Sequence, residues 1–430
     1  MQERLLNSPI VLSFISLFER AIPLLLLPFL TKYLSVENYG YLYTYLVIIT
    51  LLTPILNIGF SNYQGKQYYR EDNAKRKQIF GTYLYFQGII FFILFIISVP
   101  TYFLINNIIG YDLRFYLVLI IIGTAFFQNT LNTAISYFKI SYRFKLVGLI
   151  SFLKVILDIC FTILFVFLLS GEWYGRLFSM FFVVTILSLV SYLFLIRKNL
   201  IVIGFDKEVL RSWFNFGKHI IIHRISSIIL NLSDRLLITF ILGALSTGLY
   251  TVGYQIASII GVVATAINQA WSPWFFKYYN SKVYTKKKVN TYAIYIILMV
   301  LAAYIILVFS SPYLLPLYID IEKYNGIYKF INIIGFGLIF QAIYFCYMPF
   351  IIANNNSKLL SKISFISALT NVALNIVFLK AYGVIIAAYS TAFSWFLQGI
   401  LVFFYHNNNK DKQGIRLYFC KKIKSSLKNN

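Results

Sequence analysis

Twelve apolar runs of roughly 20 residues constrain this chain more than any other feature. A helix needs about 20 mostly apolar residues to cross a hydrocarbon core of about 30 Å, and polar breaks separate each run from the next. We therefore predict an all-α polytopic membrane protein with about 12 transmembrane helices. The predicted spans are 10–31, 42–63, 80–102, 113–138, 146–170, 176–196, 219–242, 249–272, 290–311, 327–352, 363–380 and 384–405.

The composition supports this fold class and leaves no room for a large soluble domain. Hydrophobic residues make up 60% of the 430 residues and charged residues 12%, whereas a soluble domain is nearer half apolar and a quarter charged. The first run is interrupted by Glu19 and Arg20 and shows no small-residue cleavage site. We therefore interpret it as the first membrane helix and not as a signal peptide.

The distribution of Lys and Arg predicts the orientation. Of the 38 basic residues, 28 lie in the segments on one side of the predicted spans, six (Arg176 among them) lie on the other side, and four lie inside apolar runs. Basic loops stay in the cytoplasm, so both termini are expected there. The net charge of +24 then reflects topology and contacts with anionic membrane lipids, with no nucleic acid as partner. We expect a multi-pass protein of the bacterial plasma (inner) membrane.

The longest cytoplasmic segment divides the chain into two six-helix halves. Because each half has an even number of helices, any repeat would be parallel, with its axis along the membrane normal. Short outside turns with Gly40 and Gly248, each followed by a helix that begins with aromatic residues, support such a repeat. The predicted units are an N-terminal bundle over 1–200, a connecting loop over 201–218, a C-terminal bundle over 219–405 and a basic tail over 406–430.

Charged residues inside the span 219–242 mark the candidate site. Arg224 and Arg235 lie eleven residues apart, about three helical turns, so they share one face with Asn231. Each such charge costs about 2.5–3.5 kcal/mol at a helix centre on insertion scales. We predict that this face lines a cavity and that the two guanidinium groups bind an anion, because the Arg fork matches phosphate oxygens.

Two further groups in this span are candidate charge partners or coupling groups. Asp234 lies about 80° away from the Arg224 face, so it either pairs with a neighbouring helix or carries a proton. His223 titrates near physiological pH and could take part in proton coupling. His219, closer to the cytoplasmic end, is better explained by a position among the lipid headgroups.

Two other spans each carry two charged residues close together in the sequence, and each of these pairs has two interpretations. Glu19 and Arg20 either form a local ion pair in a Pro-kinked helix or face the cavity, and we favour cavity exposure for at least one of them. Lys154 and Asp158, spaced i,i+4, either pair with each other or join the site. The spans hold four cations against three acids, a surplus that suits an anionic ligand.

Polar residues in two spans are candidates for contacts with sugar rings. The alternative for each of them is a hydrogen bond between helices, which is at least as common in membranes. The candidates are Gln128, Asn129, Asn132, Asn268 and Gln269.

Motifs for catalysis or metal binding are missing from the sequence. It has no G-x-x-x-x-G-K-[ST], H-E-x-x-H or G-x-S-x-G pattern, and its three cysteines are scattered. We expect no enzyme activity, no metal site and no bound cofactor. A transport cycle would run on a gradient of H⁺ or Na⁺, or on downhill supply of substrate.

At three places the chain resembles polysaccharide transporters of the multidrug/oligosaccharidyl-lipid/polysaccharide exporter superfamily, particularly the O-antigen flippases. These are E-R-x-x-P-L-L-L-L-P-F-L-T-K-Y-L-S-x-E-x-Y-G from Glu19 to Gly40, S-D-R-L-L-I from Ser233 to Ile238, and Leu-Ser-Thr-Gly from Leu245 to Gly248. The resemblance covers nearly the whole chain, because it also rests on the twelve helices in two six-helix halves.

The resemblance implies a V-shaped transporter that flips an undecaprenyl-pyrophosphate-linked oligosaccharide to the outer leaflet by alternating access. Carried onto this chain, Arg20, Arg224 and Arg235 would hold the pyrophosphate, with Lys154 and Asp158 as further candidates. Polysaccharide polymerase and chain-length proteins would be its protein partners. Two alternatives remain open: a multidrug or small-cation antiporter of the same superfamily, and a membrane scaffold without transport activity.

Overall fold

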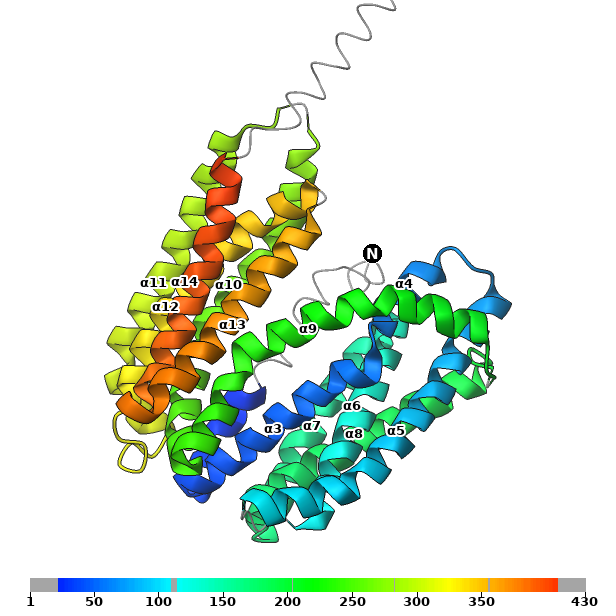
Figure 1. Cartoon of the computed structure of the whole chain (residues 1–430), viewed down its shortest axis with the longest axis horizontal. Helices are drawn as coiled ribbons and strands as arrows, with labels where there is room; N and C mark the ends of the chain where they lie inside the picture. The colour runs from blue at the N-terminus through cyan, green and yellow to red at the C-terminus, as the bar shows by residue number, and fades with distance from the viewer. Residues whose placement is uncertain (1–21, 110–113, 203, 282, 355, 409–430) are drawn as a thin grey trace, which may run out of the picture.

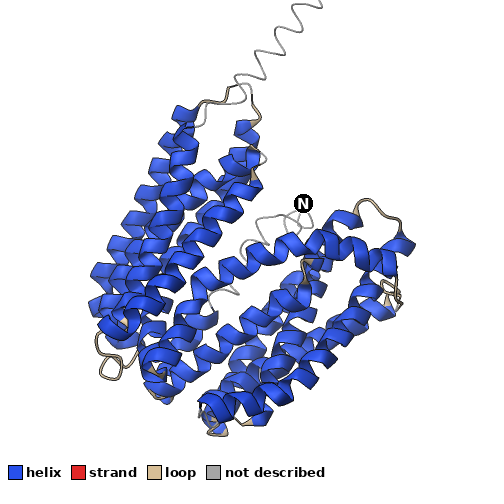
Figure 2. Cartoon of the chain, viewed as in Figure 1, coloured by secondary structure: helices blue, strands red, loops and turns tan. Residues whose placement is uncertain are grey.

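The computed structural model describes residues 22–109, 114–202, 204–281, 283–354 and 356–408, which form helices joined by short loops (Figure 2). Within these ranges eleven helices are long and apolar enough to cross a membrane, and a shorter apolar helix covers Ile22–Tyr33. The predicted all-α membrane fold is therefore confirmed. The first predicted span, 10–31, lies mostly outside the described residues.

The N-terminal half contains six labelled α-helices and one π-helical segment. The predicted span 42–63 is divided between two helices, because Ile58 and Gly59 both have left-handed backbone conformations, with φ of 44° and 69°. The elements are α3 (Val36–Asn57), α4 (Phe60–Tyr68), α5 (Asn73–Ile109), α6 (Phe115–Ile140), α7 (Phe144–Thr162), η1 (Ile163–Leu168) and α8 (Glu172–Arg197).

The C-terminal half contains six helices, several of which extend beyond the apolar runs. Their polar ends carry basic residues and aromatic rings that belong at the membrane surface. The elements are α9 (Lys207–Leu242), α10 (Ala244–Tyr279), α11 (Lys286–Tyr318), α12 (Ile327–Ala353), α13 (Ser357–Tyr382) and α14 (Ile385–Asn408).

Helix α9 begins inside the stretch predicted as a connecting loop and runs without a break to Leu242. Asp206 caps its N-terminus, since its Oδ1 accepts hydrogen bonds from the backbone N–H groups of Glu208 (2.8 Å) and Val209 (3.1 Å). Lys75 of α5 binds the other oxygen at 2.7 Å, and this hydrogen bond, followed by those of the cap, lowers the pKa of Asp206. The cap explains why the helix starts twelve residues before the apolar run.

The two halves form bundles that splay apart like a V (Figure 1). Helices α3 to α8 lie in one arm and α10 to α14 in the other, while α9 runs from the N-terminal arm, near α4, to the C-terminal arm, beside α13. Trp213 of α9 is fully buried and donates a hydrogen bond from Nε1 to the backbone oxygen of Ile58 (3.0 Å). The break between α3 and α4 is thus a docking point for the first half of α9.

The arms meet where α3 crosses α10, and glycines make this contact close. A Cβ on Gly40 would lie 1.8 Å from the backbone oxygen of Ala244, and a Cβ on Gly248 would lie 1.9 Å from that of Val36. Gly40 therefore packs on the residue four positions before Gly248, and Gly248 packs on the residue four positions before Gly40. A two-fold axis that relates α3 to α10 requires such a reciprocal contact. The sequence placed both glycines in turns, but they lie within the first two turns of α3 and α10.

Polar side chains reinforce the same contact. Tyr39 donates a hydrogen bond to Oε1 of Gln255 (2.7 Å), and the amide of Gln255 donates to Tyr43. Thr44 and Thr239 share a hydrogen bond of 2.6 Å. We call this crossing of α3 with α9 and α10 the seam, and it holds the arms together at the narrow end of the V.

Candidate functional site

A polar cavity of about 510 Å³ lies between α3, α6 and α9, and we call it the N-terminal cavity. Its volume is in the range of small-molecule binding sites. Its lining is mostly hydroxyl and amide side chains with one cation: Thr50, Thr53, Pro54, Asn57, Ser61, Asn129, Asn132, Arg224, Ser227 and Ile228.

Arg224 is the charged residue of the N-terminal cavity. Its side chain is exposed, and among the described residues it has no hydrogen bond or ion pair. A guanidinium group carries five donors and stays charged at any physiological pH. Arg224 is therefore free to bind an anion, which agrees with its prediction as a cavity cation but leaves the anion itself unassigned.

Hydrogen bonds hold the wall of the N-terminal cavity in place. Asn57 of α3 donates to Oδ1 of Asn129 in α6 (3.0 Å), and Asn129 donates to the hydroxyl of Tyr83 in α5 (2.9 Å). On the same wall Gln128 donates to Oδ1 of Asn132 (3.0 Å). Asn129 therefore takes part in hydrogen bonds between helices, which was the stated alternative. Gln128 and Asn132 bond to each other within α6, so for them both interpretations stay open.

A second cavity of about 460 Å³ lies within the C-terminal arm, and we call it the C-terminal cavity. It borders the first at Ser227 of α9, which lines both. In the described part of the chain no residue with a charge lines it, and amide and aromatic side chains predominate: Ser227, Leu230, Asn231, Thr265, Asn268, Gln341, Tyr344, Phe345, Met348, Ser364, Trp395 and Gln398.

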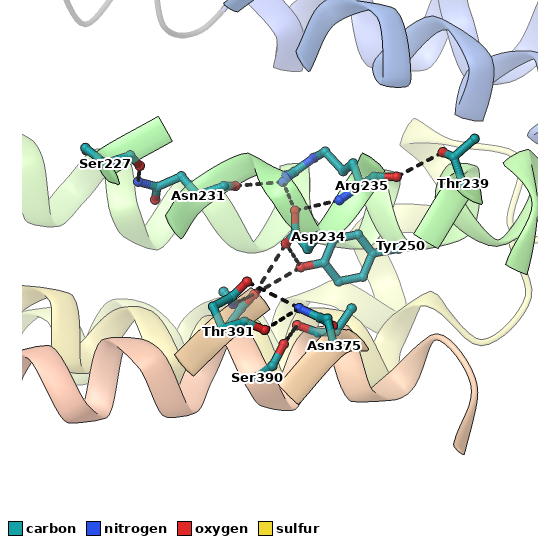
Figure 3. Close-up of polar contacts among 11 residues, drawn as sticks. Ser227, Asn231, Asp234, Arg235, Thr239, Tyr250, Asn375, Ser390 and Thr391 are labelled. Carbon is teal, nitrogen blue, oxygen red and sulfur yellow. Dashed lines mark hydrogen bonds and ion pairs between the residues drawn. The ribbon is translucent and has the colours of Figure 1, made fainter. Parts of the chain in front are cut away.

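Arg235 is buried and bound to its neighbour Asp234 (Figure 3). The Nη1 atom lies 2.8 Å from Oδ1 of Asp234 and 2.8 Å from the backbone oxygen of Asn231, which accepts a hydrogen bond from it. The guanidinium carbon lies 4.0 Å from the ring centroid of Tyr254, a cation–π contact. In this conformation the charge of Arg235 is used within the protein, so a contact with a phosphate would require the ion pair to open.

Asp234 connects α9 to the core of the C-terminal arm. Its Oδ2 accepts hydrogen bonds from the hydroxyls of Tyr250 in α10 and of Thr391 in α14 (3.3 Å) (Figure 3). Asn371 of α13 donates to Thr391 (3.4 Å), and Asn375 donates to Oδ1 of Asn371 (3.2 Å). Asp234 thus pairs with Arg235 on its own helix and also bonds neighbouring helices.

Asp158 is paired with Arg176 and not with Lys154, which corrects one of the two readings from the sequence. The ion pair is bidentate, with Nη1–Oδ1 of 2.5 Å and Nη2–Oδ2 of 2.8 Å, and both side chains are buried. Thr162 and Ser179 also accept hydrogen bonds from Nη1. The sequence counted Arg176 among the outside residues, because it stands at the start of an apolar run, where only tertiary packing decides whether it is buried.

Of the remaining predicted site residues, Lys154 is described by the structure, and it lies outside both cavities. Its side chain is half-buried in α7. Glu19 and Arg20 lie outside the described residues, as does the side chain of His223. The binding or coupling roles predicted for all of them stay predictions.

Sequence reasoning missed several cavity residues because they look like ordinary core. Trp395, Gln341 and Gln398 stand alone in apolar spans, and none carries a charge that would draw attention. Their common signal is an amide or indole N–H in a transmembrane helix, which is expensive unless it finds a partner. Asn268, which the sequence did propose, lines the same cavity.

A family model described as a polysaccharide biosynthesis protein matches residues 5–279, more than half of the 430 residues. The chain belongs to the polysaccharide biosynthesis protein family. A second model, MatE, matches residues 220–377 of this polysaccharide biosynthesis protein. Together with the fold, these matches place it among the transporters of the multidrug/oligosaccharidyl-lipid/polysaccharide exporter superfamily, as a multi-pass membrane protein.

Relatives of this polysaccharide biosynthesis protein cover different shares of its length. It is 22% identical over 408 residues to a Shigella flexneri protein named "Putative O-antigen transporter", covering 90% of this chain and 95% of that one. It is 26% identical to an uncharacterized membrane protein of Methanocaldococcus jannaschii over 49% of this chain, and it spans only 42% of that protein.

The fold of this polysaccharide biosynthesis protein is similar to that of a solved flippase. The TM-score with the lipid II flippase MurJ in an inward closed conformation is 0.76 at 16% identity, covering 94% of this chain and 88% of that one. At this identity the similarity shows the fold alone. The all-helical membrane fold expected from the sequence agrees with this similarity.

Proposed function

We propose that this polysaccharide biosynthesis protein flips an undecaprenyl-pyrophosphate-linked oligosaccharide from the cytoplasmic to the outer leaflet by alternating access. The headgroup enters the space between the arms while the polyprenyl chain stays in lipid. The arms then rock about the seam, and the headgroup leaves on the other side. The observation that carries this proposal is Arg224, an exposed cation that lines a polar cavity and has no ion pair among the described residues.

The positive charge of Arg224 favours a phosphate as the group that this cavity binds. Arg176 and Arg235 are each neutralised by a buried aspartate, so Arg224 is the cation that lines a cavity in the described part of the chain. An oxygen of a pyrophosphate would accept hydrogen bonds from its fork, with hydroxyls and amides of the N-terminal cavity beside it. The substrate is then anionic where it touches the N-terminal arm.

The basic loops support an inward-facing orientation of this conformation. The ends of α4, α9 and α14 that adjoin the predicted cytoplasmic segments lie at the wide end of the V (Figure 1). Basic segments favour the cytoplasm, so the wide end would face it, and both termini would lie on that side. The seam would then close the outer end.

Asp234 is the group at which we propose that an ion gradient acts. A proton or Na⁺ on this carboxylate would remove the counter-charge of Arg235, which lies in the same ion pair. Arg235 would then be able to bind a second anionic group, such as the second phosphate of a pyrophosphate. In everted membrane vesicles, the wild type should respond to a proton or sodium gradient, and Asp234→Asn should lose that response. A gradient response that survives Asp234→Asn would place the coupling group elsewhere.

The test of the function uses host cells that lack the chain. Lipid-linked oligosaccharide retained on the cytoplasmic leaflet is measured with and without rescue by wild type and Arg224→Ala. We expect accumulation that wild type relieves and Arg224→Ala does not. Arg211→Ala is the matched control, because Arg211 is an exposed arginine of the same helix that lines neither cavity. Full rescue by Arg224→Ala would contradict the proposal.

A drug antiporter is the second candidate, and the MatE match gives it a basis. A cavity for organic cations needs acidic side chains, but among the described residues no acidic side chain lines either cavity. A scaffold without transport activity is tested by the same cells, since it would support polymer export in the Arg224→Ala variant. Resistance profiles of the deletion strain separate the antiporter from the flippase.

A further inference from the structure

Four polar atoms of the C-terminal cavity have no hydrogen-bond partner among the described residues. They are Oδ1 of Asn268, Oε1 of Gln341, Oε1 of Gln398 and Nε1 of Trp395, and all four lie in buried positions. A buried polar atom without a partner is unfavourable, because it has lost its hydrogen bonds to water, and native proteins keep few such atoms. Three acceptors and one donor around one cavity therefore point to a ligand that offers several hydroxyls.

Three helices of the C-terminal arm carry these atoms. Trp395 is 5% exposed and Gln398 is 3% exposed, both in α14. The amide nitrogen of Gln398 donates to Ser364 of α13 (3.0 Å), which leaves its oxygen unpartnered. Asn268 comes from α10 and Gln341 from α12. Four helices of one arm thus contribute to a preformed polar pocket.

The lining of the cavity selects a neutral ligand with apolar faces. Its amides and hydroxyls donate and accept, while none of the described residues that line it is acidic or basic. Trp395 and Tyr344, with ring centroids 6.3 Å apart, give it an aromatic wall. A pyranose ring has hydroxyls around its edge and C–H groups on its faces, which matches both features. An organic cation would find no counter-charge here.

The two cavities are joined in a way that fits one two-part headgroup. Ser227, an exposed residue of α9, lines both, and Arg224 lies one turn before it on the side of the N-terminal cavity. In a lipid-linked oligosaccharide the first sugar is bonded directly to the pyrophosphate. A pyrophosphate at Arg224 would therefore place that sugar at the entrance of the C-terminal cavity.

We propose that the C-terminal cavity is a binding site for the uncharged sugars of the substrate, with Asn268, Gln341, Gln398 and Trp395 as its contacts. The inference rests on the proposed function and adds to it a division of labour. The N-terminal arm binds the phosphates, and the C-terminal arm binds the carbohydrate.

The experiment measures binding of three defined lipids to the purified full-length protein. The probes are undecaprenyl pyrophosphate and the same carrier bearing one N-acetylglucosamine or one galactose. We expect wild type to bind at least one sugar-bearing carrier about tenfold or more tightly than the sugar-free carrier, because the sugar gains several hydrogen bonds in the cavity. In Trp395→Phe/Gln341→Met this ratio should fall toward one, with affinity for the sugar-free carrier unchanged.

Two controls separate recognition from folding. Gln87→Met removes a buried amide of α5 that also lacks a partner but lines neither cavity, and it should keep the wild-type ratio. Arg224→Ala should weaken binding of all three lipids and keep the ratio. Asn268→Leu is a second pocket variant in case the double substitution fails to fold.

The outcomes distinguish the sugar site from the function. If wild type binds the three lipids equally, or if the pocket variants keep the wild-type ratio, the sugar site is wrong while the flippase proposal stands. If wild type binds none of the three, both proposals fail. A ratio that falls only in the pocket variants supports the site.

Discussion

The two cavities that meet at Ser227 have similar volumes, about 510 and 460 Å³, but they differ in the charge of their lining. The N-terminal cavity has an unpaired guanidinium group, that of Arg224, beside hydroxyls and amides. The C-terminal cavity has no charge in its lining, although Arg235 lies one turn beyond Asn231, which lines it. The difference arises because Asp234 pairs with Arg235 and removes its charge from the cavity.

This contrast shows that the partners of an arginine, and not the composition of its helix, decide whether its charge is available to a ligand. Two arginines of one helix, each costly to bury, have separate fates because one of them has a carboxylate within reach. A cavity for phosphate and a cavity for neutral sugar can then adjoin. The following variants break or sharpen that contrast.

Asp234→Ala should have the largest effect, because it leaves Arg235 buried without its counter-charge. Loss of one partner from a buried ion pair costs about 3–5 kcal/mol. We expect lower yields and a clearly lower melting temperature of the purified protein. Asp234→Leu/Arg235→Leu should regain most of the stability, since it removes both charges. Wild-type stability of Asp234→Ala would mean that Arg235 reaches water or another acid.

Arg224→Ala should weaken binding of sugar-free undecaprenyl pyrophosphate by about 10- to 100-fold. A hydrogen bond to a charged group contributes about 1.5–3 kcal/mol, and 1.4 kcal/mol is a factor of ten. Arg224→Lys should lose less, because it keeps the charge and loses the fork. Titration of the purified variants checks both. Equal affinities for wild type and Arg224→Ala would remove the phosphate from the N-terminal cavity.

Gly248→Ala should destabilise the seam, which holds the two arms together at the narrow end of the V. The added Cβ would lie 1.9 Å from the backbone oxygen of Val36, and overpacking of this kind costs about 1–3 kcal/mol. We expect a shift toward a conformation open at the seam. The measurement is labelling of Val252→Cys, a buried position of α10 that packs in the same core as Tyr39 of α3, by an impermeant thiol reagent added outside in a background without the native cysteines. Gly65→Ala is the control, because its Cβ would meet nothing closer than 3.8 Å.

Asp206→Asn should have the smallest effect, since it removes an ion pair far from the cavities and keeps an N-cap. Such pairs near the surface contribute about 0–1 kcal/mol, and asparagine caps a helix as well as aspartate. Because the pKa of Asp206 is lowered, any advantage of wild type is present above the ordinary carboxyl pKa of about 3.9. It should vanish as the pH falls through the lowered pKa. Melting temperatures at pH 7 and pH 3 test this, and a large loss at pH 7 would contradict it.

The sequence by itself determined the fold class and singled out Arg224 as a candidate site residue. Apolar runs of about 20 residues leave helices as the way to cross a bilayer, and their spacing located eleven of the described helices. The charged span 219–242 located Arg224, because a permanent cation in such a run is expensive enough to signal a function. Local properties of the chain suffice for both conclusions.

Only the tertiary structure decided which charges are free and which polar groups lack partners. Arg176 pairs with Asp158 across two helices, and Asp234 is bonded by Tyr250 and Thr391 from two others. The close contact of Gly40 with Ala244 likewise joins residues some 200 positions apart. Helical periodicity gives the face on which a side chain lies, but the energy of that side chain depends on what the neighbouring helices bring to that face.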